Sequence, residues 1–278
     1  MNMSKQQKSF DPTAQPSGDG EDGTDLLVES LLGESDLNAR LQSARALAES
    51  GNRQAVCSLV KAMGDRDYIF RAKLVKIISR LSHPSITEAV IAAIGDDDPY
   101  VRKSAIEAAQ NINSPESVKA IARCLSDEEI NVRESAVIAL ERSREAALVV
   151  EVLSAVLSDS HWNVRRECVE VLGKTGRAEA IEPLKRMCTD EDSEVRRSAL
   201  LALANVDKDG IVETALAGLN DRDQSVVLEA LYLLGEFGGA QIIPVLEERM
   251  HRQESRAIVK SSISQVIIRI NSRDERPR

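Results

Sequence analysis

Aromatic residues are scarce in this sequence. Phe, Tyr and Trp together make up 3% of 278 residues, and there is a single Trp. The hydrophobic fraction is nevertheless 42%, and Ala, Leu, Val and Ile supply nearly all of it. Short aliphatic side chains suit closely packed helices, and this amount of apolar material can form a sizeable core. The composition therefore favours an all-α protein.

Long apolar runs and excess positive charge are also absent. No stretch of about 18 apolar residues occurs, and the N-terminus, MNMSKQQK, has no apolar segment of the signal-peptide kind. The formal net charge is −9 and the pI is near 5.1, whereas nucleic-acid affinity comes from clustered Lys and Arg. We expect a cytoplasmic protein that binds neither membrane nor nucleic acid.

Few residues are available for catalysis or metal binding. The three histidines are scattered, and the four cysteines match no zinc or redox spacing: Cys57, Cys124, Cys168 and Cys188. Each cysteine lies in an apolar helical context, so we expect reduced thiols in the core. Ser, His and Asp are too dispersed for a nucleophilic triad. The sequence thus predicts no catalytic residue, no metal and no cofactor.

What the sequence does contain is an internal repeat of about 31 residues. An Arg that follows a small apolar residue recurs at intervals of 31 or 32, and two further steps of that size reach Val residues. We call these eight positions the anchors: Arg40, Arg71, Arg102, Arg133, Arg165, Arg196, Val227 and Val259. Six residues before each anchor stands an acid in seven cases of eight: Glu34, Asp65, Asp96, Asp127, Asp159, Asp190 and Asp221, with Gln253 as the exception.

Other columns of the repeat keep the same register. Positions one before and three, six and seven after the anchor are apolar or small, which traces one face of a helix. Seven after it stand Leu47, Ile78, Ala109, Leu140, Leu172, Leu203, Leu234 and Val266. Each repeat therefore reads as helix A, a short turn that carries the acid, and helix B, whose outward positions are one, five and nine after the anchor. A single helix pair cannot bury its apolar face alone, so the pairs must stack into an α-solenoid.

Breaks rich in Gly and Pro follow each helix B and set the repeat boundaries. The predicted repeats span residues 24–51, 52–82, 83–113, 114–145, 146–176, 177–207, 208–239 and 240–271. Residues 1–23 are polar and hold almost no large apolar group, so we expect a disordered tail. Residues 272–278 are expected to form a short charged C-terminal tail.

Segments such as DDDPYVRKSAIEAA, DEEINVRESAVIAL and DEDSEVRRSALLAL resemble the HEAT repeat family, in its short subtype first associated with phycobilisome lyases. The resemblance covers about residues 25–271. It implies a ladder of hydrogen bonds between the turn acids Asp65, Asp96, Asp127, Asp159 and Asp190 and the helix B arginines Arg71, Arg102, Arg133, Arg165 and Arg196. A carboxylate at the start of helix B would also cap that helix. HEAT-repeat deoxyhypusine hydroxylases carry repeated His-Glu ligands, and this sequence has no His-Glu pair.

Three local motifs are better explained by structure than by chemistry. Residues 18–23 fit G-x-G-x-x-G in letters, but no strand precedes them and three acids occupy the loop. Gly173-Lys174-Thr175 resembles the end of a phosphate-binding loop, and we expect a helix C-cap there. The run Asp96–Asp98 is expected to cap a helix rather than to bind a cation.

Trp162, in the same turn column as Tyr68 and Ile130, is expected to fill the gap between neighbouring turns.

The resemblance also implies that the helix B row forms a concave binding surface. Most of its outward positions are polar, but Leu201, Leu228 and Tyr232 are apolar and fall in adjacent repeats. We predict that these three, flanked by Arg166 and Arg197, bind a partner protein. The favoured function is a non-catalytic scaffold. A bilin lyase-like chaperone for phycobiliproteins is the alternative, although one Trp and three Tyr are few for it, and a HEAT-like DNA glycosylase fits a groove of mixed charge less well.

Overall fold

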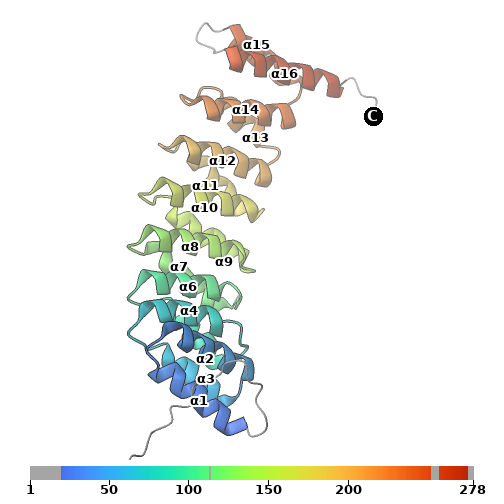
Figure 1. The fold of residues 1–278 in the computed structure, drawn as a ribbon. Coiled ribbons are helices and arrows are strands. Elements are labelled where there is room, and N and C mark those ends of the chain that lie inside the picture. The colour runs from blue at the N-terminus through green and yellow to red at the C-terminus, as the bar shows by residue number, and fades with distance from the viewer. Residues whose placement is uncertain (1–19, 113, 252–256, 275–278) are drawn as a thin grey trace, which may run out of the picture. The chain divides into compact units, whose positions relative to one another are not determined.

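The computed structural model describes residues 20–112, 114–251 and 257–274. Within these ranges it holds sixteen α-helices and no strand (Figure 1). The helices A are α1 (Gly20–Gly33), α3 (Arg53–Ala62), α5 (Pro84–Ala93), α7 (Pro115–Arg123), α9 (Ala146–Val156), α11 (Ile181–Met187), α13 (Ile211–Gly218) and α15 (Ile243–His251). The helices B are α2 (Leu37–Ser50), α4 (Tyr68–Ile78), α6 (Pro99–Ala109), α8 (Ile130–Glu141), α10 (Trp162–Lys174), α12 (Ser193–Val206), α14 (Gln224–Phe237) and α16 (Ala257–Asp274). The predicted all-α solenoid fold is confirmed.

The chain divides into two compact units between Ala89 and Val90, inside α5. In the first unit, α1 pairs with α2 and α3 with α4, and α2 packs on α4. In the second unit each helix B packs on the next, from α6 through α8, α10, α12 and α14 to α16. Short 3-10 turns complete three of the helices A: Cys124–Ser126, Ala178–Ala180 and Ala240–Ile242.

The core follows the predicted columns. The apolar residue seven positions after the anchor is buried in repeats one to seven, from Leu47 to Leu234. The residues one before the anchor are buried in repeats two to seven, from Phe70 to Val226. Burial of these columns between successive helix pairs is what makes the stack stable, because each fully buried aliphatic side chain contributes about 1.5–3 kcal/mol.

The last repeat departs from the predicted register. Ile258, expected in the core, is 51% exposed, whereas Val259 is 5% exposed. A Cβ added to Gly235 of α14 would lie 3.4 Å from the Val266 side chain of α16. A Cβ added to the equivalent glycine of α10, Gly173, would meet Ala202 of α12, which stands six residues after its anchor. This equivalence makes Lys260 rather than Val259 the anchor of the eighth repeat. Gln253, which occupies the turn-acid position in the predicted register, lies outside the described residues.

Both chain ends differ from their predicted boundaries. Helix α1 begins at Gly20, inside the segment expected to be disordered, and residues 1–19 lie outside the described part. Helix α16 continues to Asp274, although a tail was expected from residue 272. The reason is that Arg273 donates hydrogen bonds to the carbonyls of Glu236 at 2.6 Å and Gly238 at 2.8 Å, where α14 ends. Residues 275–278 lie outside the described range.

The caps of helices B correct one expectation. The acid six before the anchor does not cap helix B; the capping residue stands two positions later. There the side chain accepts backbone N–H groups of the first turn in five helices B, at Asp36, Asp67, Asp98, Asp192 and Asp223. In α8 and α10 the equivalent residues are Glu129 and His161, and neither makes a side-chain cap hydrogen bond.

Replacing His161 with Asp is therefore expected to stabilise the protein by about 1 kcal/mol, because a short carboxylate at the N-cap satisfies N–H donors of α10 and favours the helix dipole. Thermal unfolding followed by circular dichroism would measure the change. His161→Ala removes the imidazole without supplying a cap and serves as the control. Equal melting temperatures for the two variants would contradict the prediction.

Candidate functional site

The turn acids and helix B arginines form ion pairs between successive repeats. In the second unit the guanidinium of one repeat donates to both carboxylate oxygens of the next repeat's turn acid, with distances of 2.7–3.0 Å. The pairs are Arg102–Asp127, Arg133–Asp159, Arg165–Asp190 and Arg196–Asp221. In the first unit Arg40 pairs with Asp65. Arg40 and Asp221 were not in the set that the resemblance implied.

The remaining guanidinium nitrogen binds the repeat's own turn. Nη1 of Arg165 donates to the carbonyl of Asp159 at 2.9 Å, and Arg71 binds the carbonyl of Asp65 at 2.7 Å in the same way. The carboxylate of the turn acid also accepts a hydrogen bond from the backbone N–H two residues later in the chain, as Asp96 does from Asp98 at 2.9 Å. Each paired arginine of the second unit thus joins its own turn to the next one, so these residues hold successive repeats of that unit together.

Protonation of the turn acids would break these pairs. Burial alone would raise the pKa of Asp221, but hydrogen bonds from Arg196 and from the N–H of Asp223, together with the charge of Arg196, hold that pKa below its ordinary value. The stabilising contribution of Asp221 is therefore complete above the ordinary Asp pKa and is lost as the pH falls through the lower folded-state pKa. At neutral pH Asp221 is therefore charged and paired with Arg196.

The predicted partner-binding residues lie on α10, α12 and α14. Tyr232 is 54% exposed, and Leu201 and Leu228 are half-buried. Arg197, one turn before Leu201 on α12, reaches Glu229 of α14 at 3.6 Å, which places the outward faces of these two helices side by side.

The two arginines expected to flank this patch are already paired within the protein. Arg197 donates to Glu194 of its own helix at 2.8 Å. Arg166 donates to Glu167 at 2.6 Å and to Glu170 at 2.7 Å, both on α10. Their charges are therefore largely neutralised before any partner arrives.

Other exposed apolar residues on helices B were not predicted as part of the site. Ile138 is 47% exposed and Ile130 is 38% exposed, both on α8. Trp162, expected to fill the gap between neighbouring turns, is 41% exposed, with the Arg166 guanidinium 6.0 Å from the ring centre. Ile138 stands five residues after its anchor, at the same repeat position as Leu201 and Tyr232. The sequence could therefore have identified it as part of the same outward apolar position.

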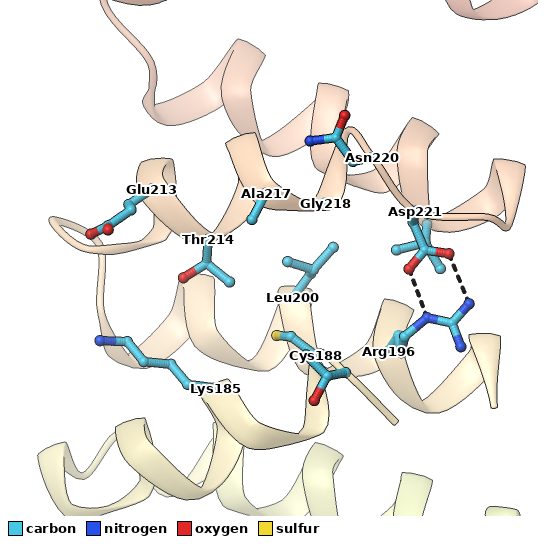
Figure 2. A pocket seen from close by; sticks show the side chains of 12 residues that line it. Lys185, Cys188, Arg196, Leu200, Glu213, Thr214, Ala217, Gly218, Asn220 and Asp221 are labelled. Atoms are coloured by element: carbon cyan, nitrogen blue, oxygen red, sulfur yellow. Dashed lines mark hydrogen bonds and ion pairs between the residues drawn. The ribbon is translucent and has the colours of Figure 1, made fainter. Parts of the chain in front are cut away.

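A hollow of about 520 Å³ opens between α11 and α13, on the helix A side of repeats six and seven. Figure 2 shows Leu200 in its interior, Lys185 and Glu213 at one side and the Arg196–Asp221 pair at the other. Cys188 is among the residues that line it, and burial raises the pKa of this thiol to about 12. The thiol stays protonated at neutral pH and is a poor nucleophile.

Three of the four cysteines fit the expected core thiols, and one does not. Cys124 and Cys168 are buried and Cys188 is half-buried, and burial raises the pKa of each thiol. Cys57, on α3, is exposed, so its placement in the core was wrong.

Over the described ranges, no group of three or more His, Cys, Asp or Glu side chains is arranged to hold a metal ion. None of the helices in those ranges is long and apolar enough to cross a bilayer.

A family model described as HEAT repeats matches residues 58–141, 87–155, 119–204 and 188–267, which together span most of the chain. The chain belongs to the HEAT repeat family. No curated protein matches it.

Solved structures with related folds share little sequence with this HEAT-repeat chain. YibA of Escherichia coli is 22% identical, with 91% of this chain and 98% of that chain covered and a TM-score of 0.55. Kap95p, solved with RanGDP, is 13% identical, with 89% and 39% covered and a TM-score of 0.64. The CpcE–CpcF complex of phycocyanin lyase from Nostoc is 18% identical, with 96% and 100% covered and a TM-score of 0.44. At these identities the likeness concerns the fold alone.

Proposed function

We propose that this HEAT-repeat protein is a non-catalytic scaffold that binds a partner protein on the outward faces of α12 and α14, through Leu201, Leu228 and Tyr232. The observation that carries the proposal is the 54% exposure of Tyr232 beside two half-buried leucines on adjacent helices. Exposed apolar clusters bordered by polar residues are typical of protein interfaces, and Tyr is enriched among the residues that dominate their binding energy.

The surroundings of the patch support binding rather than chemistry. Arg166 and Arg197 are held by carboxylates of their own and neighbouring helices, so they form a fixed polar border and are not poised to transfer protons. Burial raises the pKa of Glu229, which lies beside Leu228, and Arg197 opposes that shift. A border of paired charges around an apolar centre is the anatomy of a protein–protein interface.

The double variant Leu228→Ser, Tyr232→Ser is expected to lose capture of the native partner in affinity purification from the source cell. Its melting temperature is expected to stay close to that of the parent, because Tyr232 is exposed and Leu228 is half-buried. Val245→Ser, which changes another exposed apolar residue, on α15, is the matched control. Capture of the same protein by parent and double variant would refute this site. A new absorbance band when the protein is mixed with a linear tetrapyrrole would point instead to lyase-like chemistry.

A further inference from the structure

Exposed or half-buried apolar residues recur on the successive helices α8, α10, α12 and α14. Ile138, Leu201 and Tyr232 stand at the same repeat position, five after the anchor, on α8, α12 and α14. Because successive helices B pack directly on one another, equal repeat positions fall in a row across the stack. We call Ile138, Leu201 and Tyr232 the apolar row.

Further apolar groups widen the row on one side. Ile130 and Trp162 stand eight residues before the row position, at the starts of α8 and α10, and Leu228 stands four residues before Tyr232 on α14. Residues four and eight apart share one face of a helix, so all of them face outward with the row. The exposed fractions are 38% for Ile130, 41% for Trp162 and 47% for Ile138. The resulting surface is broad rather than a narrow slot.

Several charged residues on and beside this surface form ion pairs within the protein. On α10, where the row position is Glu170, that carboxylate accepts a hydrogen bond from Arg166 at 2.7 Å. Lys174 pairs with Glu141 at 2.9 Å. On α14, Glu236 pairs with Arg269 of α16. A strongly charged partner would have to break such pairs, whereas an apolar partner would leave them intact.

The distance between successive helices B favours a helical partner over an extended one. Packed helices lie 8–10 Å apart, so the row from α8 to α14 extends about 25–30 Å. In an α-helix, residues seven apart lie on one face about 10.5 Å apart, which matches one step of the stack. In an extended strand, residues three apart span about 10 Å but point to opposite faces. A helix of about 20 residues therefore covers the whole row.

We propose that the surface formed by the apolar row with Ile130, Trp162 and Leu228 receives an amphipathic α-helix of low net charge from the partner protein, lying across α8 to α14. The proposal rests on the proposed function and extends its site from two helices to four. The partner helix presents large apolar residues at intervals of three, four and seven, one set above each helix B. Its affinity comes from apolar burial, so it depends little on salt.

A displayed library of random 20-residue peptides tests this without assuming a sequence. Selection on the full-length protein, with counter-selection on the Ile138→Ser, Tyr232→Ser variant, is expected to enrich near-neutral peptides with apolar residues at helical spacing. Enrichment of strongly charged peptides, of peptides that alternate apolar and polar residues, or of none, would overturn the proposal.

Binding of a selected peptide without Trp can be followed on the protein itself, since Trp162 is its single Trp. Saturable binding with a blue shift of the Trp162 emission is expected, and Ile138→Ser should weaken it at least about tenfold. Ile258→Ser, at a similarly exposed isoleucine on α16, should have no effect. Between 50 and 500 mM salt the Kd should change by less than about twofold. An unchanged Kd for Ile138→Ser would exclude this surface.

Capture of the native partner by the variants distinguishes an error in this inference from an error in the proposed function. If Leu228→Ser, Tyr232→Ser abolishes its capture while Ile138→Ser and Trp162→Ser leave it unchanged, the extension to α8 and α10 is wrong and the scaffold function stands. If none of these variants affects capture, the proposed function itself fails.

Discussion

Arg165→Leu is expected to destabilise the protein by about 3–5 kcal/mol, the usual cost of removing one partner of a buried ion pair. The Arg165 and Asp190 side chains are 6% and 8% exposed. The substitution leaves the Asp190 carboxylate without its guanidinium partner. It also leaves the Asp159 carbonyl without its 2.9 Å hydrogen bond. Urea denaturation followed by circular dichroism would measure the loss.

The matched control for this prediction is Arg186→Leu, which removes an exposed arginine from α11. That change is expected to lie within about 0.5 kcal/mol of the parent. Asp190→Asn in the Arg165→Leu background should recover part of the loss, because the amide removes the buried charge and its oxygen still accepts the Asp192 N–H. If Arg165→Leu costs no more than Arg186→Leu, the ion pair does not hold the repeats together.

Gly173→Leu is expected to be comparably harmful, and even Gly173→Ala should cost about 1–3 kcal/mol. A Cβ at Gly173 would lie 2.6 Å from the Cβ of Ala202 and 2.7 Å from its Cα. The second of these is a backbone atom, so α10 and α12 would have to move apart. This cost outweighs the gain of about 1 kcal/mol that Ala has over Gly inside a helix.

Gly33→Ala supplies the control, because that glycine is also helical and a Cβ there would have nothing within 4 Å. It is expected to leave the melting temperature unchanged or to raise it slightly. Combining Gly173→Ala with Ala202→Gly should restore part of the lost stability, since one of the two clashing methyl groups is removed. A melting temperature for Gly173→Ala at or above that of the parent would show that the two helices separate at no cost.

Periodicity made the fold predictable from the sequence. A 31-residue spacing of arginines and acids marked the first six helix pairs, because both residue types serve the same turn there; the seventh pair keeps only the acid, and the eighth keeps neither. The role of Gly173 was not predictable in this way. Helix α10 does have its C-cap in the expected segment, at Thr175, and the left-handed residue is Gly176, with φ +64°, but Gly173 itself lies inside the helix. A glycine is required at position 173 because α12 packs closely against α10 there.

The candidate site was only partly predictable for a related reason. The repeat columns indicate which positions point outward, but the exposure of a side chain also depends on how closely the next helix packs. Leu41 occupies an outward column and is 5% exposed, whereas Ile138 is 47% exposed. The pairing of Arg166 with Glu170 could be expected from their spacing of four. The contact of Arg197 with Glu229 joins two repeats and required the structure.

The arginine pairs of the second unit also determine how such a chain can lengthen. Each guanidinium of these pairs binds its own turn on one side and the next repeat's carboxylate on the other, as Arg165 and Arg196 do. Duplication of a whole repeat, such as 146–176, creates a new donor and a new acceptor together. An insertion of a few residues between a turn acid and its arginine separates them. Growth by copying complete modules is thus tolerated, while small insertions are confined to the connections that follow helices B.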